Sequence, residues 1–198
     1  LVVATGFFDR AGITLLTDVH ENTSYGPLKR ALVKIGMEET FHLRHGEVWM
    51  RRLSKAGGEA KEMVQRCVDW MFPMTIEWFG LPDDMKRHSG QLDYKLKGLT
   101  NDQLRQVWMA STVPLCEQLG LDAPAHWDEE KGEYVLDYPF PCQYNEEEKR
   151  WMFEEGEISW DTVFKRWKGR GPMNEIYVES VQRSRGDVKR LLNGKSVA

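Results

Sequence analysis

The sequence has no long apolar run, no paired cysteines and no excess of basic residues. No stretch approaches the roughly 20 apolar residues that a membrane-spanning helix needs, so no membrane partner is predicted. Cys67, Cys116 and Cys142 are far apart and form no C-x-x-C pair, which predicts reduced thiols in a cytoplasmic protein rather than a disulfide or zinc framework. The net charge is -4 without a basic stripe, which argues against nucleic acid as a partner.

Several signatures of common enzyme folds are also missing. The chain contains no G-x-S-x-G, no P-loop and no G-x-G-x-x-G, which argues against α/β-hydrolase and nucleotide-binding folds. The 198 residues, 41% apolar and 29% charged, have the balance of one soluble globular core with at most an appendage. The chain opens on Leu1-Val-Val-Ala rather than methionine, and we expect a fragment that begins inside a helix.

Apolar residues recur at helical spacing over most of the first 119 residues. The spacing predicts helices over residues 2–20, 28–53, 59–79 and 100–119. Pro27 suits the start of the second helix, and Gly57 and Gly58 suit its end. Thr100, followed by Gln103, is a capping box.

Beyond Gly120 the pattern changes. Residues 127–138 predict a short hairpin that turns at 129–132. Asn145, followed by three glutamates, predicts the start of a helix that ends at Gly156. Ser159 predicts the start of another short helix, which Gly169 ends.

The chemistry of the chain centres on residues 34–47, which hold Glu39-x-x-His42. On a helix, positions i and i+3 lie one turn apart on the same face, so a carboxylate and an imidazole can hold one metal ion there. Glu-x-x-His is the repeated ligand unit of ferritin-like di-iron carboxylate proteins, one copy on each of two helices. A single copy is weak evidence, because the pattern is common by chance on solvated helices.

A count along the first two predicted helices supplies a third ligand. If these helices form an antiparallel pair around residues 23–26, Glu39 lies about 15 residues, or roughly 23 Å, from the turn. The residue at the same depth on the first helix is then Asp9 or Arg10, and Asp9 is the only acid near that level. An acid opposite Glu-x-x-His is what half of a di-iron site in a helical bundle requires.

Other interpretations of these residues stay open at the level of sequence. Glu38 could replace Glu39 as the ligand, although it points ~100° away. His45 could be a further ligand, and Asp9 could instead pair with Arg10 or Lys34. We predict no catalytic side chain beyond the metal ligands.

Several short motifs follow one another in a fixed order along the chain. They are Thr23-Ser-Tyr-Gly-Pro27, Lys34-Ile, Glu38-Glu-Thr-Phe-His42, Arg44-His-Gly, Thr100-Asn-Asp-Gln-Leu-Arg105, Val113-Pro, Leu119-Gly-Leu and Gly169-Arg-Gly171. This series resembles the catalytic A subunits of the bacterial phenylacetyl-CoA epoxidases (ring 1,2-phenylacetyl-CoA monooxygenases). The resemblance runs from about Phe7 to about Asn174, and the motifs together are more specific than Glu-x-x-His alone.

The resemblance implies a mainly α-helical, ferritin-like bundle, of which this chain is a C-terminal portion with an irregular helical extension. It implies a di-iron centre that activates O₂ to epoxidise the ring of phenylacetyl-CoA in aerobic phenylacetate catabolism. It also implies a ferritin-like structural partner subunit, together with a separate reductase that uses NADPH and carries FAD and an iron–sulfur cluster. Glu39 and His42 match the family's second Glu-x-x-His. Asp9 matches the acidic ligand on the preceding helix, although the family spacing places the neighbouring Arg10 at that position.

The family's site also needs a Glu and another Glu-x-x-His from upstream helices, and this sequence contains only one Glu-x-x-His. We therefore expect residues 1–79 to carry half of a di-iron site and residues 80–198 to form a partner-docking extension. The chain by itself is expected to be incomplete and inactive. The alternatives are a non-catalytic, ferritin-like structural subunit without metal, and a helical interaction module without a site.

Overall fold

The computed structural model describes residues 1–86, 90–169 and 179–186. The described chain is mainly α-helical, and the predicted ferritin-like fold class is confirmed. The chain consists of two compact units, Leu1–Glu157 and Ile158–Ala198. The functional division predicted at residues 79 and 80, into a metal-bearing part and a docking part, stays a prediction.

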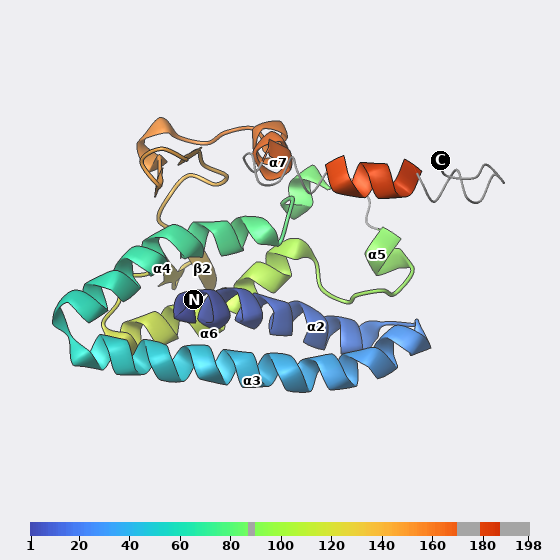
Figure 1. Ribbon diagram of the computed structural model, residues 1–198, viewed down its shortest axis with the longest axis horizontal. Helices are drawn as coiled ribbons and strands as arrows, with labels where there is room; N and C mark the ends of the chain where they lie inside the picture. The colour runs from blue at the N-terminus through green and yellow to red at the C-terminus, as the bar shows by residue number, and fades with distance from the viewer. Residues whose placement is uncertain (87–89, 170–178, 187–198) are drawn as a thin grey trace. The chain divides into compact units, whose positions relative to one another are not determined.

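The first unit is built on an antiparallel helical hairpin (Figure 1). Its first arm is one continuous helical segment made of α1 (Val2–Ala4), η1 (Thr5–Asp9) and α2 (Arg10–Asn22). Its second arm is α3 (Gly26–Ala56), with Pro27 in the first turn and Gly57, at φ 73°, just after the last residue. Both predicted helices and the predicted turn are therefore confirmed. The unforeseen feature is that η1 is a π-helical turn.

Two further helices pack on this hairpin. Helix α4 (Gly58–Trp78) continues through Pro73, and η2 (Asp83–Met85) and α5 (Gly90–Asp93) lead from it toward α6 (Asn101–Leu119). The Thr100 hydroxyl accepts from the Gln103 amide, and the Gln103 side chain accepts from the Thr100 amide, so the predicted capping box is confirmed. None of the described helices is long and apolar enough to cross a membrane.

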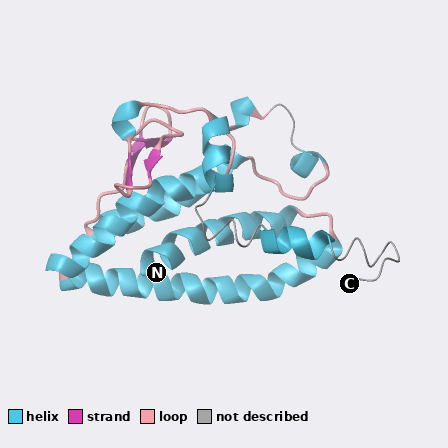
Figure 2. Ribbon diagram, turned by 45° about the horizontal axis from the view of Figure 1, so that its top comes forward, coloured by secondary structure: helices cyan, strands magenta, loops and turns pink. Residues whose placement is uncertain are grey.

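Two short antiparallel strand pairs follow α6 and are drawn as arrows in Figure 2. Strands β1 (Ala125–Asp128) and β2 (Glu133–Leu136) pair from Ala125 opposite Leu136 to Asp128 opposite Glu133, as the sequence predicted. Strands β3 (Tyr144–Asn145) and β4 (Arg150–Trp151) form the second pair, and η3 (Phe153–Glu155) follows them.

The second strand pair corrects the helix predicted to begin at Asn145. The Asn145 side chain accepts hydrogen bonds from the amides of Glu147 and Glu148, which is the local geometry that also caps helices. Here the chain instead turns back at Lys149, which has a left-handed φ of 55°, and pairs with itself. The same side-chain bonds serve a turn and a helix start, so the sequence signal was ambiguous.

An aromatic cluster joins the helices of the first unit. Phe7 of η1, Phe72 of α4 and Trp108 of α6 are fully buried, with ring centroids 4.9–6.1 Å apart. The Trp108 indole donates to the Phe7 carbonyl oxygen at 3.1 Å, in addition to the Arg10 amide that donates to the same oxygen. This cluster places η1, and therefore Asp9, against the other helices.

The second unit contains α7 (Trp160–Gly169) and a helical segment at residues 179–186. The Ser159 hydroxyl accepts from the Thr162 amide at 3.3 Å, so the predicted start of this helix is confirmed. Trp160, Phe164 and Trp167 lie on one side of α7 with ring centroids 5.5–6.3 Å apart.

Candidate metal centre

Asp9, Glu39 and His42 come together between the two arms of the hairpin. Each of the three residues offers a ligand atom, and these atoms all lie within 4.8 Å of one another. Asp9 is the last residue of η1, whereas Glu39 and His42 occupy adjacent turns of α3. Among the described residues, these three form the one group of His, Cys, Asp or Glu side chains placed closely enough to hold a metal ion. The geometry agrees with the count along the hairpin, and the ligand role of the three residues stays a prediction.

The cluster is partly buried on its acidic side and open on its imidazole side. The Asp9 side chain is 25% exposed and the His42 side chain 54% exposed, with 4.0 Å between Asp9 Oδ2 and His42 Nδ1. Burial raises the pKa of the Asp9 carboxyl above its usual value, and the nearby His42 opposes that rise. A cation at this place would stabilise the ionised form of Asp9, which burial disfavours.

The π turn at residues 5–9 sits where the two arms approach most closely. A side chain at Gly46 would put its Cβ 2.6 Å from the Gly6 nitrogen, and one at Gly6 would put its Cβ 2.5 Å from Met50 Sδ. Glycine at position 46 therefore lets the two backbones meet, and glycine at position 6 leaves room for the Met50 side chain. A π turn adds one residue to a helical turn, so it shifts the phase of the segment before it relative to α2. Val3, Phe7 and Ala11 are all buried on the side that faces the core.

Arg10 and Glu47 form an ion pair beside the cluster that the sequence did not reveal. Arg10 Nη2 donates to Glu47 Oε1, and Arg10 Nε donates to the Gly6 carbonyl oxygen at 3.3 Å. Arg10 was the residue that the family spacing placed at the third ligand, and in the structure it contacts Glu47 instead. No signal for this pair was present in the sequence, because Glu47 lies eight residues further from the turn than Glu39, the residue that the count places level with Arg10.

The structure also bears on the alternatives left open by the sequence. Glu38 is exposed and lies outside the cluster. His45 is exposed as well, with its ring centroid 6.3 Å from that of Trp49. Among the described residues, the basic side chain found 4.0 Å from the Asp9 carboxylate is that of His42 rather than that of Arg10 or Lys34. The geometry thus favours Glu39 over Glu38 and does not bring His45 into the group.

The chemistry of the donor set fits iron. Two carboxylates and one imidazole are oxygen and nitrogen ligands of the kind found in non-haem iron sites with open positions. The set matches an acid plus Glu-x-x-His, and a complete ferritin-like di-iron site uses four carboxylates and two histidines. Asp9, Glu39 and His42 therefore suit part of such a site, with the rest to come from outside these three residues.

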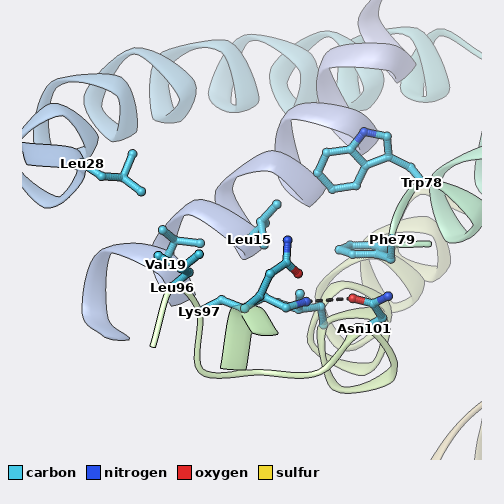
Figure 3. A pocket seen from close by; sticks show the side chains of 10 residues that line it. Leu15, Val19, Leu28, Trp78, Phe79, Leu96, Lys97 and Asn101 are labelled. Carbon is cyan, nitrogen blue, oxygen red and sulfur yellow. Dashed lines mark hydrogen bonds between the residues drawn. The ribbon is translucent and has the colours of Figure 1, made fainter. Parts of the chain in front are cut away.

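A separate pocket of about 320 Å³ lies at the other end of the hairpin, near the turn (Figure 3). Its wall is mostly apolar, with a polar edge where the Lys97 ammonium donates to Asn101 Oδ1 at 2.8 Å. Burial lowers the pKa of Lys97. The pocket does not include the three residues of the cluster; it is lined by Leu15, Val19, Leu28, Trp78, Phe79, Gln91, Leu96, Lys97, Asn101 and Leu104.

Comparison with known proteins shows the family of the chain. Residues 1–169 match the family described as phenylacetic acid catabolic protein. The chain is 32% identical over 166 residues to the A subunit of 1,2-phenylacetyl-CoA epoxidase from Escherichia coli (strain K12), and the match covers 82% of this chain and 48% of that protein. The chain thus spans about half the length of the curated relative it matches. The family match extends over most of the sequence, and on that basis the chain belongs to the phenylacetic acid catabolic protein family.

Proposed function

We propose that this chain is part of the catalytic subunit of a di-iron monooxygenase that epoxidises the aromatic ring of phenylacetyl-CoA with O₂. The observation that carries the proposal is the meeting of Asp9, Glu39 and His42 in a member of this family. The similarity to one component of a phenylacetyl-CoA epoxidase supports the substrate and the reaction. The same resemblance supports a ferritin-like partner subunit, a separate NADPH-, FAD- and iron–sulfur-containing reductase, and a cytoplasmic location.

In the proposed reaction, bound iron supplies the redox chemistry that activates O₂. The residues of this chain hold and orient the metal. Asp9 and Glu39 provide anionic oxygens, and His42 provides a neutral nitrogen on the more exposed side of the group. The buried aromatic cluster of Phe7, Phe72 and Trp108 stiffens the helical segment that carries Asp9. Rigid support of this kind limits the reorganisation that metal binding would otherwise require.

The proposal predicts that iron binding depends on these three side chains. In the protein that contains this chain, Glu39→Gln and His42→Ala should each lower bound iron, measured by elemental analysis, by at least about tenfold. Glu38→Gln is the matched control, because Glu38 is the exposed neighbour on the same helix and its replacement removes the same charge. Circular dichroism checks that each variant folds. Full iron content in both ligand variants would contradict the proposal.

A second candidate is a non-catalytic, ferritin-like subunit that binds no metal. It is favoured by one observation, that the His42 side chain is 54% exposed, as a residue that binds no metal would be. Iron content also separates the two candidates. A structural subunit would contain no iron whatever stands at positions 39 and 42, and the Glu39→Gln change would leave product formation by the reconstituted complex unaltered.

A further inference from the structure

Asp9 and Arg10 are neighbours with opposite charges at the level of the cluster, and only one of them can face it. Adjacent residues of a helix point ~100° apart, so a rotation of the first arm by that angle would exchange their positions. We propose that the Arg10–Glu47 ion pair is a positioning device that keeps Asp9, rather than Arg10, directed at Glu39 and His42. The proposal rests on the proposed function in one respect, the binding of metal by Asp9.

The geometry of α3 explains how the Arg10–Glu47 pair limits rotation of the first arm about its own axis. Glu47 follows His42 by five residues, which places it about 140° further around the helix. The two side chains therefore project from different sides of α3, and the first arm lies against α3 between them. Arg10 reaches the Glu47 side and Asp9 reaches the His42 side. Rotation that brought Arg10 toward His42 would break its contact with Glu47.

The burial of the pair shows that losing it would be costly. The Arg10 side chain is 11% exposed and the Glu47 side chain 31% exposed. An arginine that is this deeply buried requires a counter-charge, because an unpaired charge in a poorly hydrated place is strongly destabilising. Without Glu47, the carboxylates of the cluster become the alternative partners of Arg10. A guanidinium on those oxygens would compete with a metal ion for them.

The close contact beside the pair limits other adjustments. Gly6 lies against Gly46, and its carbonyl oxygen accepts the Arg10 Nε hydrogen bond. The π turn, the glycine contact and the ion pair therefore act on the same few residues, 5–10 and 46–47. Of these three features, only the ion pair depends on charge, because Glu47 attracts Arg10 and would repel Asp9.

A charge swap tests the proposal in the full protein that contains this chain. Glu47→Arg should lower the affinity for Co²⁺, followed by its absorption spectrum, by about tenfold or more. The double variant Arg10→Glu with Glu47→Arg should restore most of that affinity, because the pair is rebuilt with reversed charges. Glu59→Arg, a reversal at an exposed position of α4, is the control and should change nothing. An unchanged affinity in Glu47→Arg, or a double variant as weak as the single one, would overturn the proposal.

A structural readout without metal separates this proposal from the proposed function. In crystal structures of the metal-free protein, the 4.0 Å approach of Asp9 Oδ2 to His42 Nδ1 should persist in the wild type and the double variant and be lost in Glu47→Arg. If Glu47→Arg does not fold, the milder Glu47→Gln takes its place. Absence of Co²⁺ binding in the wild type would refute the metal site, whereas an Asp9–His42 contact that survives without the pair would refute the positioning role.

Discussion

At the scale of single residues, the candidate site combines groups that are unfavourable for stability with groups that hold them in place. The pKa of Asp9 is raised because its carboxyl is partly buried, so the ionised form of this residue destabilises the metal-free fold. The favourable effect of His42 is smaller than this cost. Such a conflict is common where a side chain is placed for binding rather than for folding.

The raised pKa of Asp9 predicts that Asp9→Asn stabilises the metal-free protein at neutral pH. The folded pKa lies above the unfolded value of 3.8, so the folded state binds more protons between the two values and loses stability as pH rises through that window. The gain from Asp9→Asn should therefore be present at pH 7 and vanish as pH falls below 3.8. Thermal unfolding from pH 7 downward measures it, and a lower melting temperature for the variant at pH 7 would contradict the prediction.

The three cysteines should differ in reactivity. Burial raises the pKa of the Cys116 thiol to about 12, and Cys142 is also buried, whereas Cys67 is partly exposed. Since the thiolate is the reactive form, a disulfide reagent at pH 8 should label Cys67 first and the other two only on unfolding. Cys67→Ser should remove the fast phase. A fast phase that persists in this variant would show that a buried thiol is accessible.

At the scale of the elements, the hairpin is held by backbone contacts that depend on particular glycines. Gly46 of α3 meets the backbone of residues 5 and 6, so α3 and the π turn approach more closely than any side chain would allow. Gly36 lies more than two turns earlier on the same helix, and a Cβ added there would have no neighbouring atom within 4 Å. A side chain would therefore fit at position 36 but not at position 46 of the same helix.

This contrast predicts opposite effects of one substitution. Gly36→Ala should stabilise the protein by up to about 1 kcal/mol, because alanine favours a helix more than glycine does. Gly46→Ala should destabilise it by about 1–3 kcal/mol, because the new methyl group overlaps backbone atoms that cannot move aside easily. Urea unfolding of the pair measures both free energies. Equal effects at the two positions would show that the close contact is not formed.

At the scale of the whole first unit, one aromatic cluster connects the arm that carries Asp9 to the rest of the core. Trp108 of α6 contacts Phe7 of η1 and Phe72 of α4, and its indole donates to the Phe7 carbonyl oxygen. Trp151 of β4 similarly donates to the Trp70 carbonyl oxygen at 2.7 Å and ties the second strand pair to α4. Tryptophans thus link segments that are distant in the sequence.

The cluster predicts a large effect of a conservative change. Trp108→Phe should lower the free energy of unfolding by about 2 kcal/mol, since it leaves a cavity and removes the buried hydrogen bond from the indole to the Phe7 carbonyl oxygen. Trp127→Phe is the matched control, because Trp127 of β1 is 45% exposed, and should cost about 0.5 kcal/mol or less. Chemical denaturation of both variants measures the difference. Similar costs for the two would contradict the assignment of Trp108 as the link between the helices.

The sequence by itself determined the helices of the hairpin, their turn, the capping box at Thr100 and the first strand pair, because each depends on local patterns of apolar, capping and turn residues. The count along the hairpin also brought Asp9 to the level of Glu39, since the rise per residue of a helix is constant. Asn145 was misassigned because its side-chain bonds serve a turn as well as a helix.

Only the tertiary structure decided which of two neighbouring residues faces the cluster. The choice between Asp9 and Arg10 depends on rotation about the helix axis, and a count of residues gives depth but not rotation. The π turn, the contact between Gly6 and Gly46 and the pair of Arg10 with Glu47 set that rotation through contacts between segments about 40 residues apart. Local sequence patterns carry no information on such contacts, which form only when the two arms pack.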